Sequence, residues 1–306
     1  MNLVNQMTIG LMPLVPKFIV GQVASRYIAG ETVANAFATI KTLQGEGAMA
    51  TVDVLGEHSE SKEQAAEAVK EYFKIIDGIK AGGYEANVSL KPTHMGLKLG
   101  YEFCREQIEQ VVARAAEAGI FVRIDMEDRS CTDDTLRLYF DLRKKYEKVG
   151  VVIQAYLRRT VKDIQPLMEA KANLRLCKGI YNEPRMAAFK NRGIIINNYA
   201  FLLENLLKAG CYVGIATHCE ETIWQAERIV HILGLNRNRY EFQMLLGVEP
   251  ALRRILISQG HRLRVYVPYG SEWYAYSTRR LKENPAIAGH VMKSFLGLEQ
   301  RDEKVQ

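Results

Sequence analysis

The stretch VVIQAYLRRT, residues 151–160, decides the fold because it joins a short run of branched apolar residues to polar ones. Val151, Val152 and Ile153 follow one another without apolar–polar alternation, which is typical of a strand covered on both faces. Gln154 is a polar residue at the far end of this run. The stretch therefore predicts a strand of a parallel sheet whose two faces are both buried.

Seven similar runs occur along the chain and alternate with longer segments of helical periodicity. This order is typical of parallel strands joined by helical crossovers. The eight runs cover residues 49–55, 86–90, 120–126, 151–157, 174–178, 212–217, 241–245 and 263–267. Eight strand–helix units in about 260 residues predict an α/β fold of the (βα)8 TIM-barrel type. A doubly wound open sheet is the alternative.

The sequence predicts where three of the helices between the strands begin. Val69, Phe73 and Ile76 form a helical stripe that follows Ser59 and Ser61, either of which could cap the helix. A second start is Thr132 with Asp133 and Asp134, since acidic groups favour the positive end of a helix. A third is Pro250 after Glu249, because proline is well suited to a first helical position.

The bulk composition is typical of a soluble globular protein. Of 306 residues, 48% are hydrophobic and 25% charged, and the net charge of +6 is spread along the sequence without a basic tail. Nucleic-acid binding is therefore not expected. Five cysteines are an odd number without CxxC spacing, which favours a reduced cytoplasmic compartment.

The first 16 residues carry no charged side chain, but Asn2, Asn5, Gln6, Pro13 and Pro16 interrupt them. We predict neither a signal peptide nor a membrane span there. The segment either packs on the barrel as an amphipathic element or makes transient peripheral contact with the membrane. The expected organisation is an N-terminal helical appendage over residues 1–44 and a catalytic barrel over residues 45–306.

Several familiar motifs are missing or misplaced. Gly45, Gly47 and Ala50 imitate a dinucleotide fingerprint, but they precede a strand instead of joining a strand to a helix. The sequence has no phosphate-binding GxxxxGK[ST] loop and no HxH or HExxH spacing, so no metal is expected. Cys219 beside His218 is weak evidence for a thiol nucleophile, because neighbours on a strand point to opposite faces.

Polar residues gather at the ends of the predicted strands, where a barrel carries its chemistry. Each of them alone could be a solvated charge at the rim, but their repetition indicates a site. These residues are Lys91, Asp125, Gln154, Arg175, Lys178, Thr217, His218 and Tyr266.

A second group lies near the C-terminus, where the spacing of Tyr276, Arg279, Arg280 and Glu283 places all four on one helical face. Two neighbouring guanidinium groups can bind a carboxylate or a phosphate. The alternative is an exposed helix with an ordinary Arg279–Glu283 ion pair.

In this order, the segments NVSLKP, RIDMED, VVIQAYLRRT, LRLCKGIY, GIATH, EFQMLLG, RVYVPYG and AYSTRRLKEN resemble the proline dehydrogenase family, both its monofunctional bacterial form and the matching domain of bifunctional proline utilisation proteins. The resemblance runs from about residue 45 to residue 290. It implies a distorted barrel that binds FAD at the C-terminal strand ends, beneath a last helix that lies over the site. It also implies oxidation of L-proline to (S)-1-pyrroline-5-carboxylate, the first step of proline catabolism to glutamate, with electrons passed to a quinone and the product to a pyrroline-5-carboxylate dehydrogenase.

The resemblance implies substrate roles for seven residues. Arg279 and Arg280 would hold the proline carboxylate, with Glu283 orienting them and Lys91 on the opposite side. Tyr266 and Tyr276 would wall the substrate ring, and Leu245 would lie on the flavin side of the pocket.

For the cofactor, the resemblance places Arg175 near the reactive flavin nitrogen and Gln154 at the isoalloxazine edge. Asp125 would serve the catalytic centre by positioning Tyr266 or a water. Met126 would line the ring system, and Lys178, Gly179 and Ile180 would shape the flavin pocket. Thr217 and His218 would contact the ribityl and diphosphate region.

Two positions depart from the family pattern, Asn182 where some members have an aromatic residue and Cys219 after the TH pair. Three other functions stay open on the residues alone. They are a Schiff-base lyase or aldolase using Lys91 or Lys178, a barrel that binds a ligand without chemistry, and the same oxidation of hydroxyproline.

Overall fold

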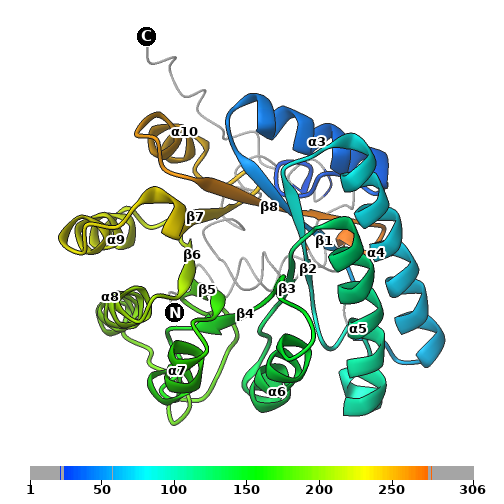
Figure 1. Ribbon diagram of the computed structural model, residues 1–306, viewed down its shortest axis with the longest axis horizontal. Coiled ribbons are helices and arrows are strands. Elements are labelled where there is room, and N and C mark those ends of the chain that lie inside the picture. The colour runs from blue at the N-terminus through cyan, green and yellow to red at the C-terminus, as the bar shows by residue number, and fades with distance from the viewer. Residues whose placement is uncertain (1–20, 22–23, 57, 275–276, 278–306) are drawn as a thin grey trace, which may run out of the picture.

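The computed structural model describes residues 21, 24–56, 58–274 and 277. Within this range, eight parallel strands follow one another around a closed barrel in chain order (Figure 1). The ladder between the first and last strands closes it, with Met49 opposite Arg264 and Val54 opposite Tyr269. The predicted (βα)8 barrel is therefore confirmed, and the open-sheet alternative is wrong because such a sheet would leave both of these strands at an edge.

All eight predicted strands are present, β2 with the predicted bounds and the others with one or both ends shifted. They are β1 Met49–Val54, β2 Ala86–Leu90, β3 Val122–Ile124, β4 Val149–Gln154, β5 Asn173–Cys177, β6 Tyr212–Ala216, β7 Tyr240–Leu245 and β8 Leu263–Tyr269. The strands β3 and β4 end earlier than predicted. Asp125, Ala155 and Tyr156 follow these strands at the C-terminal mouth of the barrel, where their backbone N–H groups still donate to the carbonyls of Leu90, Cys177 and Lys178, each at 2.8 Å.

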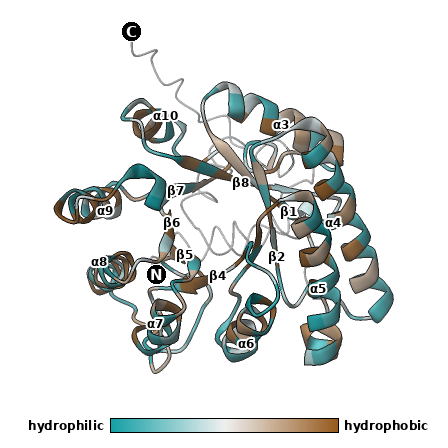
Figure 2. Ribbon diagram, in the orientation of Figure 1, coloured by the Kyte–Doolittle hydropathy of each residue, from teal (hydrophilic) through white to brown (hydrophobic). Residues whose placement is uncertain are grey.

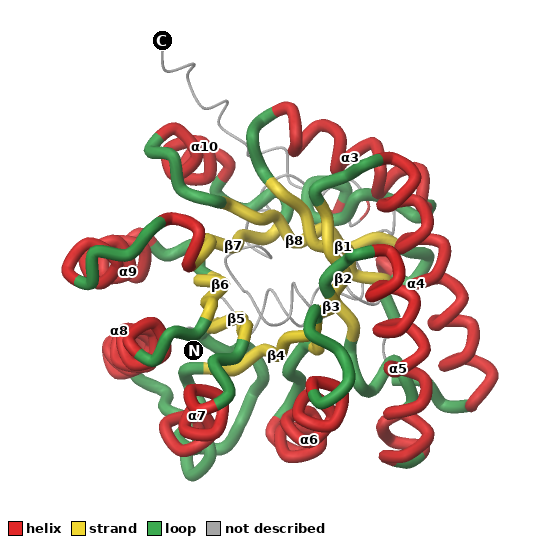
Figure 3. Tube along the Cα trace, in the orientation of Figure 1, coloured by secondary structure: helices red, strands yellow, loops and turns green. Residues whose placement is uncertain are grey.

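Helices surround the strands on the outside (Figure 3). They are α3 Val33–Gly45, α4 Lys62–Gly82, α5 Tyr101–Ala118, α6 Thr132–Arg143, α7 Thr160–Glu169, α8 Arg192–Lys208, α9 Glu220–Ile232 and α10 Pro250–Ser258, with short 3-10 turns at Leu97–Leu99, Arg129–Cys131 and Arg237–Arg239. None of the helices in the described ranges has the length and hydropathy that crossing a membrane requires. The predicted C-terminal helix lies outside the described residues.

The three helix starts are confirmed, each in its own way. Ser61 caps α4 by accepting a hydrogen bond from the Gln64 backbone N–H at 3.3 Å. The helix α6 begins at Thr132, although the side chain of this residue makes no capping hydrogen bond. Pro250 is the first residue of α10, where its missing N–H costs no helical hydrogen bond.

The apolar core lies between the strands and the helices, and Figure 2 shows brown segments on both. Along β3, Val122 and Ile124 are fully buried in this core, and α3 packs beside β1 and β8. Successive strand residues point to opposite faces, so Arg123 between them points into the barrel. The barrel interior differs from the usual layers of branched aliphatic side chains, because arginines, carboxylates and amides fill much of it.

Candidate functional site

A cavity of about 800 Å³ opens at the C-terminal ends of the strands. Every predicted site residue in the described part of the chain lines it. These residues are Lys91, Asp125, Met126, Gln154, Arg175, Lys178, Gly179, Ile180, Thr217, His218, Leu245 and Tyr266. Their individual roles stay predictions. Tyr276, Arg279, Arg280 and Glu283 lie outside the described residues.

Arg175 is the centre of the polar network in this cavity. From β5 its guanidinium donates to Gln243 Oε1 at 2.5 Å, to Asp125 Oδ1 at 2.7 Å and to Ser89 Oγ at 3.1 Å. These partners come from β7, from the end of β3 and from β2, so the side chain crosses the barrel interior. Only 8% of Arg175 is exposed. A buried guanidinium with three partners is a fixed positive charge in the cavity wall.

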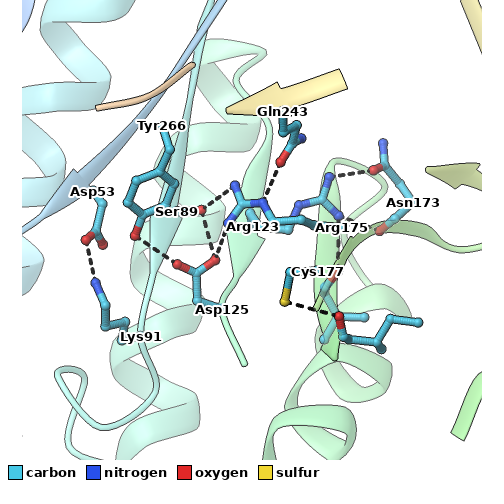
Figure 4. Close-up of polar contacts among 12 residues, drawn as sticks. Asp53, Ser89, Lys91, Arg123, Asp125, Asn173, Arg175, Cys177, Gln243 and Tyr266 are labelled. Carbon is cyan, nitrogen blue, oxygen red and sulfur yellow. Dashed lines mark hydrogen bonds and ion pairs between the residues drawn. The ribbon is translucent and has the colours of Figure 1, made fainter. Parts of the chain in front are cut away.

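Asp125 joins Arg175 to the aromatic wall of the cavity (Figure 4). Its Oδ2 accepts a hydrogen bond from the Tyr266 hydroxyl at 3.1 Å, and its Oδ1 accepts one from Ser89 at 3.1 Å. The Arg175 guanidinium lies 5.2 Å from the centre of the Tyr266 ring. Asp125 therefore links the Tyr266 ring to the Arg175 guanidinium.

Lys91 forms an ion pair with Asp53, a residue that the strand-end argument missed (Figure 4). The Asp53 side chain is fully buried, whereas 13% of the Lys91 side chain is exposed. Burial raises the pKa of Asp53, and the Lys91 ammonium opposes this shift. The pair holds the lysine amine at the wall of the cavity.

Ser89 and Gln243 also belong to the polar network, although no strand-end pattern points to either of them. Like Asp53, both lie inside strands whose neighbouring residues are apolar. A polar residue inside a run that is apolar on both sides must find a buried partner. This signal was present in the sequence, but its partner could not be read from it.

The opposite wall is built from loops after β4, β5 and β6. Gln154 donates from Nε2 to the Glu127 carbonyl at 2.8 Å. His218 accepts the Leu245 backbone N–H at Nε2, at 2.7 Å, so its Nδ1 carries the proton when the ring is neutral. Gly179 has a φ of +102°, and a Cβ there would lie 2.0 Å from the Tyr156 ring. Residue 179 must therefore be a glycine, because its backbone packs directly on the Tyr156 ring.

Cys219 lies at the rim of the same cavity. Burial alone would raise the pKa of its thiol, but hydrogen bonds from Thr222 and the charges of Lys178 and Arg192 lower it to about 7. The Arg192 guanidinium is 3.0 Å from the sulfur. The Nε2 atom of the neighbouring His218 accepts the Leu245 backbone N–H.

Comparison with known proteins gives consistent results. Residues 36–293 match a family model described as "Proline dehydrogenase". Proline dehydrogenase 1 of Bacillus subtilis (strain 168) is 37% identical over 273 residues, which cover 89% of this chain and 90% of the relative. Proline dehydrogenase of Deinococcus radiodurans is 35% identical over 278 residues, with the same coverage.

Among solved structures, proline utilization A from Bdellovibrio bacteriovorus, inactivated by N-propargylglycine, superposes with a TM-score of 0.81 at 24% identity. The match covers 91% of this chain and 34% of that one. At this identity the likeness bears on the fold alone, and it agrees with the closed barrel.

Proposed function

Because this chain belongs to the proline dehydrogenase family, we propose that it transfers hydride from L-proline to FAD and forms (S)-1-pyrroline-5-carboxylate. It is therefore an oxidoreductase of proline catabolism. The family match favours this function over the alternative of a Schiff-base lyase or aldolase. The main support for the proposal is the cavity. Twelve predicted residues line it, among them Arg175 with its buried guanidinium. An ion-paired Lys91 also argues against a Schiff base, because its amine is held by a carboxylate.

The residues present fit a flavin nucleotide. The cavity volume of about 800 Å³ lies within the range of cofactor sites. The cationic side chains of Lys178 and Arg192 line the same cavity and suit a diphosphate. We assign ring contacts to Gln154 and Met126, and the ribityl and diphosphate region to Thr217 and His218.

When bound, the flavin supplies an acceptor for two electrons and a proton as hydride. Arg175 stabilises the negative charge that develops on this acceptor, because its guanidinium is already fixed in place. Asp125, Ser89 and Gln243 hold the guanidinium, so no reorientation is needed during the reaction. Tyr266, held by Asp125, walls the ring of the substrate, and Leu245 lies on the flavin side.

The substrate amine must lose its proton before hydride leaves C5, because the nitrogen lone pair drives that step. Fixing the carboxylate orients C5 toward the flavin and lowers the entropic contribution to the activation free energy. We assign this fixation to Lys91 from within the barrel and to Arg279 and Arg280 from the C-terminal segment. Glu283 would orient the two arginines, and Tyr276 would complete the wall.

We expect Arg279→Met or Arg280→Met to raise the apparent KM for proline at least tenfold, while kcat falls less. Each substitution removes a charge-assisted hydrogen bond to the carboxylate and keeps much of the side-chain length. Steady-state kinetics with a dye acceptor measure this split. An unchanged KM in both variants would remove these arginines from the carboxylate site.

The experiment for the whole proposal is an anaerobic titration of the purified protein with L-proline, followed in the flavin absorbance band. Bleaching by L-proline, with little response to D-proline or hydroxyproline, is the expected result. A colourless protein that takes up no added FAD would overturn the flavin assignment. A yellow protein that responds better to hydroxyproline would change the substrate and keep the cofactor.

The electrons must then leave the flavin, and we propose a membrane quinone as their acceptor. Its support is the apolar stretch over residues 1–16, which has the composition for transient peripheral contact with the inner face of the membrane. The protein itself would be cytoplasmic. The pyrroline product would pass to a pyrroline-5-carboxylate dehydrogenase, since its hydrolysis gives an aldehyde that can be oxidised further.

A further inference from the structure

Arg123 is a charged side chain buried in the barrel interior below the cavity, with 2% of its surface exposed. It extends from β3 and donates to the Asn173 backbone carbonyl at 2.8 Å and to Asn173 Oδ1 at 2.7 Å. A longer bond of 3.3 Å reaches the Val151 carbonyl, and the Phe121 ring lies 4.7 Å from the guanidinium. All of these acceptors are neutral.

Three ion pairs balance the other charges that point inward from the strands and strand ends, and Arg123 has no such partner within the described part of the chain. The buried carboxylate of Glu127 lies higher, in the loop after β3 at the cavity, where the backbone N–H and the hydroxyl of Thr93 donate to it. The pairs are Lys91–Asp53, Arg175–Asp125 and Arg264–Glu241. Burial alone would raise the pKa of Glu241, but the guanidinium of Arg264, at 2.7 Å, lowers it to about 2. Among the residues that the structure describes, Arg123 takes part in no ion pair.

Burial, with the nearby charge of Arg175 added, lowers the pKa of Arg123 to about 9, so the group stays cationic at neutral pH. An unpaired charge in this position opposes folding. The surroundings nevertheless make room for it. A Cβ on Gly150 would lie 2.4 Å from Arg123 Nη1 and 2.3 Å from the Asn173 carbonyl oxygen, so glycine here leaves the space that the guanidinium fills.

We propose that Arg123 is an electrostatic residue that leaves the barrel interior with a net positive charge beneath the cofactor cavity and favours acceptance of hydride there. This inference rests on the proposed function. Asp125, two residues further along the same segment, lines the cavity, so Arg123 lies one layer of about 7 Å below it. In an interior without bulk water, a charge acts over such a distance with little screening.

Asn173→Asp gives the cleanest test, because it places a carboxylate 2.7 Å from Arg123 Nη2 and keeps the hydrogen bond. The holoenzyme should then show a more negative flavin midpoint potential, and the equilibrium constant for reduction by L-proline should fall about tenfold. The flavin-free protein should melt at a higher temperature than wild type, because the buried cation has gained a partner.

Arg123→Met removes the cation by a second route, and Arg123→Lys is the matched control that retains it. Met should lower the potential as Asn173→Asp does, and Lys should keep most of the wild-type value. If the Arg123→Met variant does not fold, the flavin midpoint potential of Asn173→Asp compared with that of wild type is the test. A wild-type potential in Asn173→Asp would overturn the inference and leave Arg123 a structural role. Failure of the wild-type protein to take up flavin is a different result, which would reject the proposed function itself.

Discussion

Arg175→Ala is expected to slow flavin reduction by L-proline at least a hundredfold, or to release the flavin during purification. The substitution withdraws a fixed positive charge from the place where negative charge develops, and one such donor contributes about 100- to 1000-fold in other enzymes. It also leaves the Asp125 carboxylate without its 2.7 Å partner. Stopped-flow absorbance under anaerobic conditions measures the reduction rate separately from later electron transfer.

Two further variants make this result interpretable. Arg175→Lys keeps the charge but cannot bond Gln243, Asp125 and Ser89 together, so an intermediate rate is expected. Arg137→Ala removes an arginine whose side chain is 58% exposed on α6, and it should reduce at the wild-type rate. A wild-type rate with full flavin content in Arg175→Ala would show that the assigned electrostatic role is wrong.

Asp53→Ala should destabilise the protein by about 3–5 kcal/mol, the usual cost of removing one partner of a buried pair. The Lys91 ammonium would remain in a largely buried position without its carboxylate. Chemical denaturation followed by circular dichroism gives the free energy of unfolding. The same variant should bind proline more weakly, because Lys91 loses the contact that orients it.

The double variant Asp53→Ala with Lys91→Met separates the two contributions. Removing both charges should recover part of the lost stability, since no unpaired ion is left, whereas proline affinity should not recover. A loss below about 1 kcal/mol in Asp53→Ala would mean that Lys91 readily finds water or another partner. In that case the pair would not be what fixes the amine.

Much of the fold could be predicted because the strand signal is local. Val151 to Ile153, for example, are consecutive apolar residues. A strand that is buried on both faces gives this pattern whatever its partners in the sheet are. The strand ends were less predictable. The strand β3 ends just before Asp125, whose carboxylate bonds Arg175 and Tyr266, residues far away in the sequence.

The site could be predicted where polarity and strand ends coincide, as at Lys91 and Gln154, and where a charge interrupts an apolar run close to its end, as at Arg175. Asp53 was missed because Val54 and Leu55 follow it, so it does not end its run. The surplus charge of Arg123 was invisible for a different reason. Counting charges in the interior requires knowing which side chains point inward and which pairs form, and the paired residues Arg175 and Asp125 are 50 positions apart.

The polar filling of the barrel also bears on how the chain reaches its native state. The ion pairs join β5 to the end of β3 and β8 to β7, while Tyr266 of β8 reaches Asp125. A half barrel ending at β4 would contain Asp125 and Arg123 without either Arg175 or Asn173. Slippage of β8 by one residue would turn Arg264 and Tyr266 outward. Closure is therefore expected to be cooperative and restricted to one register, and this architecture is poorly suited to folding as two independent halves.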